Sequence, residues 1–143
     1  MKTAAILIAR LIFAFVFAMA ASFKFVFIGI DATAAQIAGA GFPIPHILAW
    51  VAAFFEMALA LGFLTGLYFS EVAVVAIAYV LFLAFSFHGP ERCKANPMEF
   101  GFFVDHFTFV AGLLFAAVHG PGQTLAWNAR KAYNRTSGEM QNA

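Results

Sequence analysis

The stretch Ile47–Leu64 reads ILAWVAAFFEMALALGFL, and its one charged residue is Glu56. A helix crosses the hydrocarbon core of a bilayer with about 20 mainly apolar residues. The stretch is close to that length, and it lacks the alternation of apolar and polar residues that marks membrane β-strands. It therefore predicts a transmembrane helix with a carboxylate in its middle.

Three further segments have the same apolar character, and the whole chain is unusually poor in charge. Of the 143 residues, 64% are hydrophobic and 10% are charged, whereas soluble domains have about 25% charged residues. We expect an all-α membrane protein, a four-transmembrane-helix bundle formed as a single domain over residues 1–143. Its spans are predicted at about 4–23, 47–64, 72–87 and 101–118, with a polar C-terminal tail at 123–143.

The first span needs a check, because Ala18-Met19-Ala20 resembles a signal-peptidase site. Arg10 interrupts the apolar stretch at the place where a signal peptide would have its hydrophobic region. We therefore expect a retained first span.

With four spans, both termini lie on the same side of the membrane. The loop charges weakly favour a cytoplasmic location for the termini, because cytoplasmic segments carry more Lys and Arg. The side of the termini has Lys2, Arg130, Lys131 and Arg135, and the opposite side has Lys24, Arg92 and Lys94.

The connector from Lys24 to His46 is the longest, and it contains a possible short amphipathic helix. We expect this helix to end at Gly39-Ala40-Gly41. Pro43 and Pro45 follow, and they prevent the second span from simply extending backward. The later connector HGPERCKANPMEF is expected to be a polar loop.

Several classes of function are disfavoured. The net charge of +1 and the absence of a basic cluster argue against nucleic-acid binding. A single cysteine, Cys93, excludes an intrachain disulfide. The ligand types of His88, Cys93, Met98 and His106 suit copper, but no repeated spacing supports a site, and we expect no metal.

Ionisable residues inside a span usually face the bundle interior and find partners there. Counted from the ends of the first two spans, Arg10 and Glu56 lie at depths that a long guanidinium can bridge. We predict that they form a structural ion pair. A pair of this kind fixes how helices pack and needs no catalytic role.

A second cluster is expected toward the opposite ends of the spans. Lys24 and Asp105 should lie at similar depth, with His106, His88 and Ser86 near the same level. A histidine beside a carboxylate suits proton transfer. The alternative, with about equal weight, is a buried structural pair.

The sequence also resembles that of a known protein family. Arg10-Leu11, Lys24 and the block AGAGFPIPHILAWVAAFFEMALALGFLTGLY occur in an order that resembles DoxX-like integral membrane proteins, as does Gly120-Pro121-Gly122 after the last span. The positions carried over are Arg10, Lys24 and Glu56. The chain departs from the family pattern at Asp105-His106, where a neutral amide or a lysine is more usual.

The resemblance implies a small protein of the bacterial cytoplasmic (inner) membrane, linked in some members to quinone-dependent sulfur oxidation. On this basis we expect quinone as the cofactor. The predicted cluster would then supply Asp105 and His106 for proton exchange and Lys24 to stabilise negative charge, so we expect these three as catalytic residues and Lys24, Ser86 and His106 as the residues that bind the quinone. The sequence has no haem, flavin or metal signature, so electrons would come from a partner or a small reductant.

Two other functions remain open. One is a non-catalytic accessory subunit that packs against a larger membrane complex, and the other is a small-solute or proton channel formed by a homo-oligomer. Whether the protein is an enzyme is left undecided by the sequence.

Overall fold

The structure, a computed structural model, describes residues 2–122 and residue 126. Its elements are α1 (Lys2–Ser22), a π-helical turn η1 (Phe23–Phe27), α2 (Gly29–Gly39), α3 (Pro45–Thr65), α4 (Phe69–His88), α5 (Pro90–Ala95) and α6 (Pro97–His119). No strand occurs among these residues. The predicted all-α fold is confirmed.

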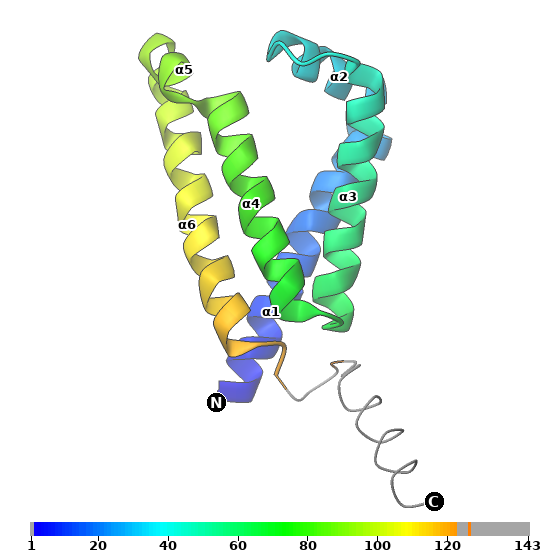
Figure 1. The fold of residues 1–143 in the computed structure, drawn as a ribbon, viewed down its shortest axis with the longest axis vertical. Helices are drawn as coiled ribbons and strands as arrows, with labels where there is room; N and C mark the ends of the chain where they lie inside the picture. Colours follow the sequence, from blue (N-terminus) through cyan, green and yellow to red (C-terminus); the bar gives the residue numbers. More distant parts are fainter. Residues whose placement is uncertain (1, 123–125, 127–143) are drawn as a thin grey trace, which may run out of the picture.

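Four stretches are long and apolar enough to cross a membrane, namely Ala4–Phe27, Pro45–Thr65, Phe69–Ala95 and Pro97–His119. Each predicted span falls within one of them, which confirms a multi-pass membrane protein. The start of α1 and the end of α6 lie at the same end of the bundle (Figure 1), as an even number of spans requires. The predicted polar tail, with Arg130, Lys131 and Arg135, lies outside the described residues.

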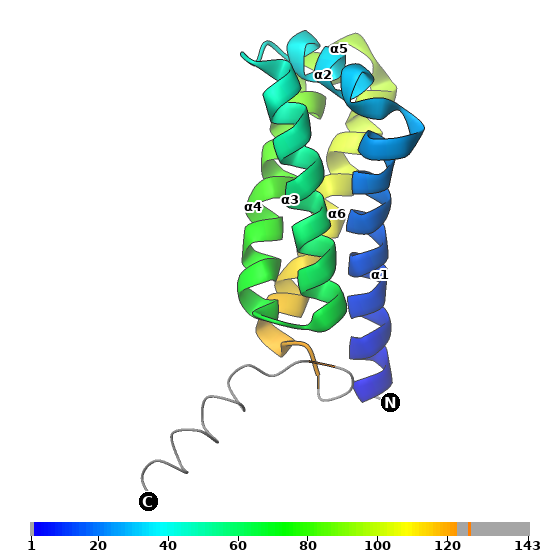
Figure 2. The ribbon, with the colours of Figure 1, turned by 90° about the vertical axis from the view of Figure 1, so that its right-hand side faces the viewer.

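The long helices form two pairs. Helix α1 packs along α3, and α4 packs along α6, with far less contact between the pairs. Figure 1 shows that the pairs meet at one end and diverge toward the other, and Figure 2 shows the same helices from the side. We call the end with the α3–α4 turn the closed end and the end with α2 and α5 the open end.

Aromatic side chains from different helices join the two pairs near the closed end. Phe63 of α3 stacks on Phe17 of α1 with ring centroids 5.7 Å apart, and it meets the ring of Phe69 of α4 edge-on at 5.5 Å. Phe13 of α1 contacts Phe109 of α6 at 5.3 Å. Rings in such tilted and offset pairs attract each other beyond the effect of burial alone. The closed end is therefore a filled core.

The turn between α3 and α4 is tight because two of its residues have a left-handed backbone. Gly66 has φ 69° and Tyr68 has φ 47°. Glycine adopts this conformation without a Cβ penalty. The turn holds the two helix pairs together at the closed end.

The open end carries the two short helices. The predicted amphipathic helix is present as α2, which buries Thr33, Ala34 and Ile37 and packs on α3. The polar connector expected after the third span is instead α5 followed by the first turn of α6. Asn96 caps α6 by accepting a hydrogen bond from the backbone N–H of Met98, and Pro97 fits the first helical position. The fourth span therefore begins earlier than residue 101.

Candidate functional site

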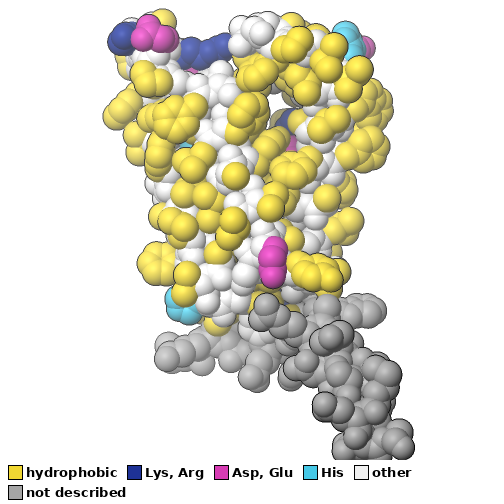
Figure 3. All heavy atoms as spheres, viewed as in Figure 1, with side chains coloured by type: hydrophobic (Ala, Val, Ile, Leu, Met, Phe, Trp, Pro, Cys, Tyr) yellow, Lys and Arg dark blue, Asp and Glu magenta, His cyan; other side chains and the backbone are white. Residues whose placement is uncertain are grey.

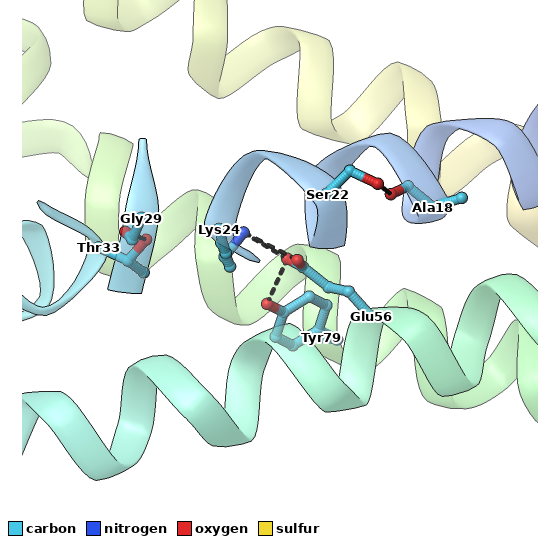
Figure 4. Close-up of polar contacts among 7 residues, drawn as sticks. All are labelled: Ala18, Ser22, Lys24, Gly29, Thr33, Glu56 and Tyr79. Carbon is cyan, nitrogen blue, oxygen red and sulfur yellow. Dashed lines mark hydrogen bonds and ion pairs between the residues drawn. The ribbon is translucent and has the colours of Figure 1, made fainter. Parts of the chain in front are cut away.

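A buried ion pair joins the π-helical turn η1 to the middle of α3. The Lys24 ammonium lies 2.9 Å from Oε1 and 2.8 Å from Oε2 of Glu56. The hydroxyl of Tyr79, from α4, donates to Oε1 at 2.8 Å. Figure 4 shows the three side chains converging on the carboxylate. The side chain of Glu56 is only 3% exposed and that of Lys24 is 21% exposed, so the carboxylate depends on these two partners.

The local backbone explains how Lys24 reaches Glu56. Residues Phe23–Phe27 form a π-helical turn directly after α1. Such turns are rare in proteins, and those that occur are often at functional sites. Just before the turn, the Ser22 hydroxyl donates to the carbonyl oxygen of Ala18 (Figure 4), a bond that often bends helices. The wider turn changes the direction in which Lys24 points relative to a regular α-helix.

A cavity of about 830 Å³ lies next to this pair, toward the open end. Lys24 and Tyr79 line it, and so do side chains from α2, α3, α4, α5 and α6. Figure 3 shows an opening between the helix pairs on an apolar face, with charged side chains inside it. The apolar lining consists of Ile37, Phe42, Leu48, Val51, Ala52, Phe55, Phe82, Leu83 and Phe87.

A second polar group lines the cavity on the α4–α6 side. His88 Nδ1 lies 2.6 Å from Oε2 of Glu99, and both side chains are about a quarter exposed. The ring of His106 lies 5.2 Å from that of His88. The Nδ1–H of His106 donates to the carbonyl oxygen of Phe102, since a carbonyl can only accept. In the neutral ring, Nε2 of His106 is then a proton acceptor.

The predicted pairing of Arg10 with Glu56 is wrong. The Glu56 carboxylate takes Lys24 and Tyr79 as its partners, while Arg10 donates from Nη1 to the carbonyl oxygen of Pro121 at 3.1 Å. The prediction placed the ends of the first two spans at the same level. In fact, α1 begins beyond the α3–α4 turn (Figure 1). Arg10 Nη1 lies 3.2 Å from the position where a Cβ on Gly66 of that turn would be, so Arg10 lies nearer the closed end than Glu56, which is in the middle of α3.

The predicted cluster of Lys24, Asp105, His106 and Ser86 is brought together only in part. Lys24 and His106 both line the cavity, and Asp105 and Ser86 are not among its lining residues. Asp105 is exposed on α6. Adjacent residues on a helix point about 100° apart, so His106 faces the cavity while Asp105 does not.

Two residues of the site were missed as partners. The bond of Tyr79 to Glu56 was not predicted. Glu99 was assigned to a loop, although Asn96-Pro97 is a recognisable helix start. With the helix begun there, Glu99 and His106 are seven residues apart and share a face.

Comparisons with known proteins agree with the four-helix architecture. A family model described as DoxX matches residues 5–89, which includes Arg10, Lys24, Glu56, Tyr79 and His88 and is more than half of the chain. Glu99, Asp105 and His106 lie beyond the match. No curated protein matches the chain. No solved structure matches it either. With a match of this extent, the chain belongs to the DoxX family.

Proposed function

We propose that this DoxX protein binds a quinone in the cavity at the open end and serves quinone-linked redox chemistry as a subunit of a membrane oxidoreductase. The observation that carries the proposal is the cavity itself. Its volume of about 830 Å³ falls within the range of about 300–1,000 Å³ that is typical of small-molecule sites. Its exposed wall surface is mainly apolar and aromatic, and polar side chains also line it.

The polar groups suit a ring with hydrogen-bond acceptors at two separate positions. Lys24 has three N–H donors, and it faces both the Glu56 carboxylate and the cavity. On the other wall, Nε2 of His88 or His106 is an N–H donor to a quinone oxygen when its ring is protonated, and an acceptor for a quinol O–H when its ring is neutral. The aromatic residues between these groups, such as Phe55 and Phe82, provide surfaces on which a planar ring can pack.

The chain's own part in the chemistry is to hold a ring and to move protons. A quinone takes up two electrons and two protons when it is reduced, and the electrons come from a partner protein or a small reductant. The Lys24–Glu56 pair keeps a cation beside the cavity and places it where negative charge would develop. The His88–Glu99 pair and His106 exchange protons between the cavity and the open end.

We place the protein in the bacterial cytoplasmic membrane, with the closed end toward the cytoplasm. The distribution of Lys and Arg between the two sides supports this orientation. Lys94 is exposed on α5 at the open end. In a Cys93→Ser chain, a cysteine introduced at residue 94 should react with a membrane-impermeant maleimide added outside intact cells. Reaction only after the cells are broken would reverse the orientation.

Quinone binding is tested best by filling the cavity. Ala52 lines the cavity from α3, and Ala58 lies exposed on the same helix. We expect Ala52→Trp to weaken binding of a short-chain ubiquinone by at least about tenfold, because an indole occupies the site, whereas Ala58→Trp leaves it unchanged. Equilibrium dialysis of the detergent-purified protein measures both.

Two further variants separate a binding role from the alternatives. His106→Ala should lower both quinone retention after purification and turnover in the native complex, while Asp105→Asn should leave quinone retention unchanged. If Ala52→Trp binds as wild type does, or if the wild type binds no quinone, the proposal fails. A stable larger assembly with normal redox activity in all variants would instead indicate an accessory subunit.

A further inference from the structure

Helix α6 has an exposed carboxylate within its membrane-spanning stretch. Asp105 is eight residues into α6, or about 12 Å from its first residue at 1.5 Å per residue. The apolar residues around it, such as Val104 and Phe107, are also exposed. Only Val110 and Leu113 of this helix are fully buried. Helix α6 is therefore the least covered of the four long helices.

The direction of Asp105 follows from its neighbour Phe109. Four residues apart on a helix, the two side chains point only about 40° apart. Phe109 packs against Phe13 and Phe17 of α1, with ring centroids 5.3 and 5.8 Å away. Asp105 lies one turn nearer the open end, and its side chain is exposed there. Asp105 therefore lies on the side of α6 that faces α1, but nearer the open end than the part of that side that α1 covers.

An isolated carboxylate in this position is costly. An aspartate at the centre of a spanning helix costs about 2.5–3.5 kcal/mol on insertion scales, and such residues usually face a partner. Among residues 2–122 and 126, the ion pairs involve Asp31, Glu56, Glu91 and Glu99 and do not include Asp105. The charge on this face is therefore not balanced within the described part of the chain.

We propose that the face of α6 around Gly101, Asp105 and Thr108 docks a transmembrane helix of another protein that carries a Lys or Arg at the same depth. The charge of Asp105 specifies the cation. Gly101 has no atom within 4 Å of the position where a Cβ would be, and small residues let helix backbones approach closely. This inference is independent of quinone binding.

A second copy of the chain is the less suitable occupant. Arg10 is buried, and Lys24 is bound to Glu56. Arg92 and Lys94 lie on α5, which precedes the first residue of α6 at the open end, and they bind Gly39 and Glu91. Among the described residues no Lys or Arg is therefore presented on the outside of the bundle at the depth of Asp105, and a different chain is the better source of the cation.

The test uses model helices in place of an unidentified partner. The full chain with Cys93→Ser and an added C-terminal cysteine carries an acceptor dye, and it is reconstituted into phosphatidylcholine vesicles. Two donor-labelled 23-residue Leu/Ala peptides are compared. One has Lys and the other has Leu at the position about 12 Å from one end. We expect energy transfer to show at least about tenfold tighter binding of the Lys peptide. Asp105→Asn should abolish that preference, and Glu71→Gln, an exposed carboxylate on α4, should retain it.

A variant with the opposite charge distinguishes loss of the specific contact from loss of folding. Asp105→Lys should prefer a peptide with Asp at the same depth, which an unfolded chain would not do. The proposal is overturned if wild type binds the Lys and Leu peptides equally, or if Asp105→Asn keeps the preference. It is also overturned if labelled chains self-associate and Asp105→Asn disperses them, because the face would then belong to a second copy.

Discussion

The Lys24 ammonium lies within 2.9 Å of both carboxylate oxygens of Glu56, and so the π-helical turn is joined to the middle of α3. Removal of one partner of a buried pair leaves an uncompensated charge, which costs about 3–5 kcal/mol. We therefore expect Lys24→Met and Glu56→Gln each to lower the free energy of unfolding by about that amount. SDS titration of the protein in mixed micelles measures it.

The double variant Lys24→Met/Glu56→Gln serves as the control for this prediction. With both charges removed, its loss of stability should be smaller than the sum of the two single losses, since the two residues interact directly. Additive losses would mean that the two side chains stabilise the bundle independently.

Tyr79→Phe should destabilise the bundle by about 1.5–3 kcal/mol, because hydrogen bonds to charged groups are worth about that much. The variant removes the 2.8 Å bond to Glu56 and keeps the ring that packs on Phe55. Tyr68→Phe is the matched control, since Tyr68 is 64% exposed. The same unfolding titration compares them, and equal stability of the two variants would contradict the assigned bond.

Gly66→Ala should lower the free energy of unfolding by about 1–3 kcal/mol, which is the typical cost of a left-handed backbone conformation at a residue other than glycine. Gly66 has φ 69°, and an added Cβ would lie 3.2 Å from Nη1 of Arg10 and 3.1 Å from Cβ of Pro121. Gly101→Ala is the control, because it lies in a helix with open space around it. It should be neutral or stabilising by up to about 1 kcal/mol. A neutral Gly66→Ala would mean that the turn tolerates a different geometry.

Arg92→Ala should widen the separation of α2 and α5 without unfolding the bundle. The Arg92 side chain donates to the carbonyl oxygen of Gly39 at 3.3 Å, which links the two helix pairs across the open end. Spin labels on Cys93 and on a cysteine at residue 38 report this distance by double electron–electron resonance. Lys94→Ala is the control, since Lys94 pairs with Glu91 within α5. A distance distribution identical to that of wild type would show that the bond does not hold the helices.

The four spans and the amphipathic helix were predictable because each rests on local properties. Length and hydropathy define a span, and Gly39-Ala40-Gly41 with the prolines that follow defines the end of α2. The start of α6 was placed too late because the polar residues around Glu99 resemble a loop. They are polar because they lie at the open end, and some of them line the cavity.

The contacts of the site were less predictable, because they depend on how the helices are offset and bent. A helical wheel assumes regular geometry, and the π-helical turn at Phe23–Phe27, which contains Lys24, breaks that assumption. The proximity of His88 and Glu99 depends on α5 reversing the chain between α4 and α6. Composition indicated which residues were unusual for a membrane span, but the partner of each required the tertiary structure.

The divergence of the two helix pairs has a consequence for the surrounding lipid. A bundle that is broad at one end and narrow at the other displaces more lipid from one leaflet than from the opposite one. Lateral pressure in the leaflet around α2 and α5 then pushes the pairs together, and the aromatic contacts of Phe63 at the other end act as the pivot. The space available beside Lys24 and His106 is therefore coupled to the packing of the bilayer, and a membrane that is more tightly packed in that leaflet favours a narrower site.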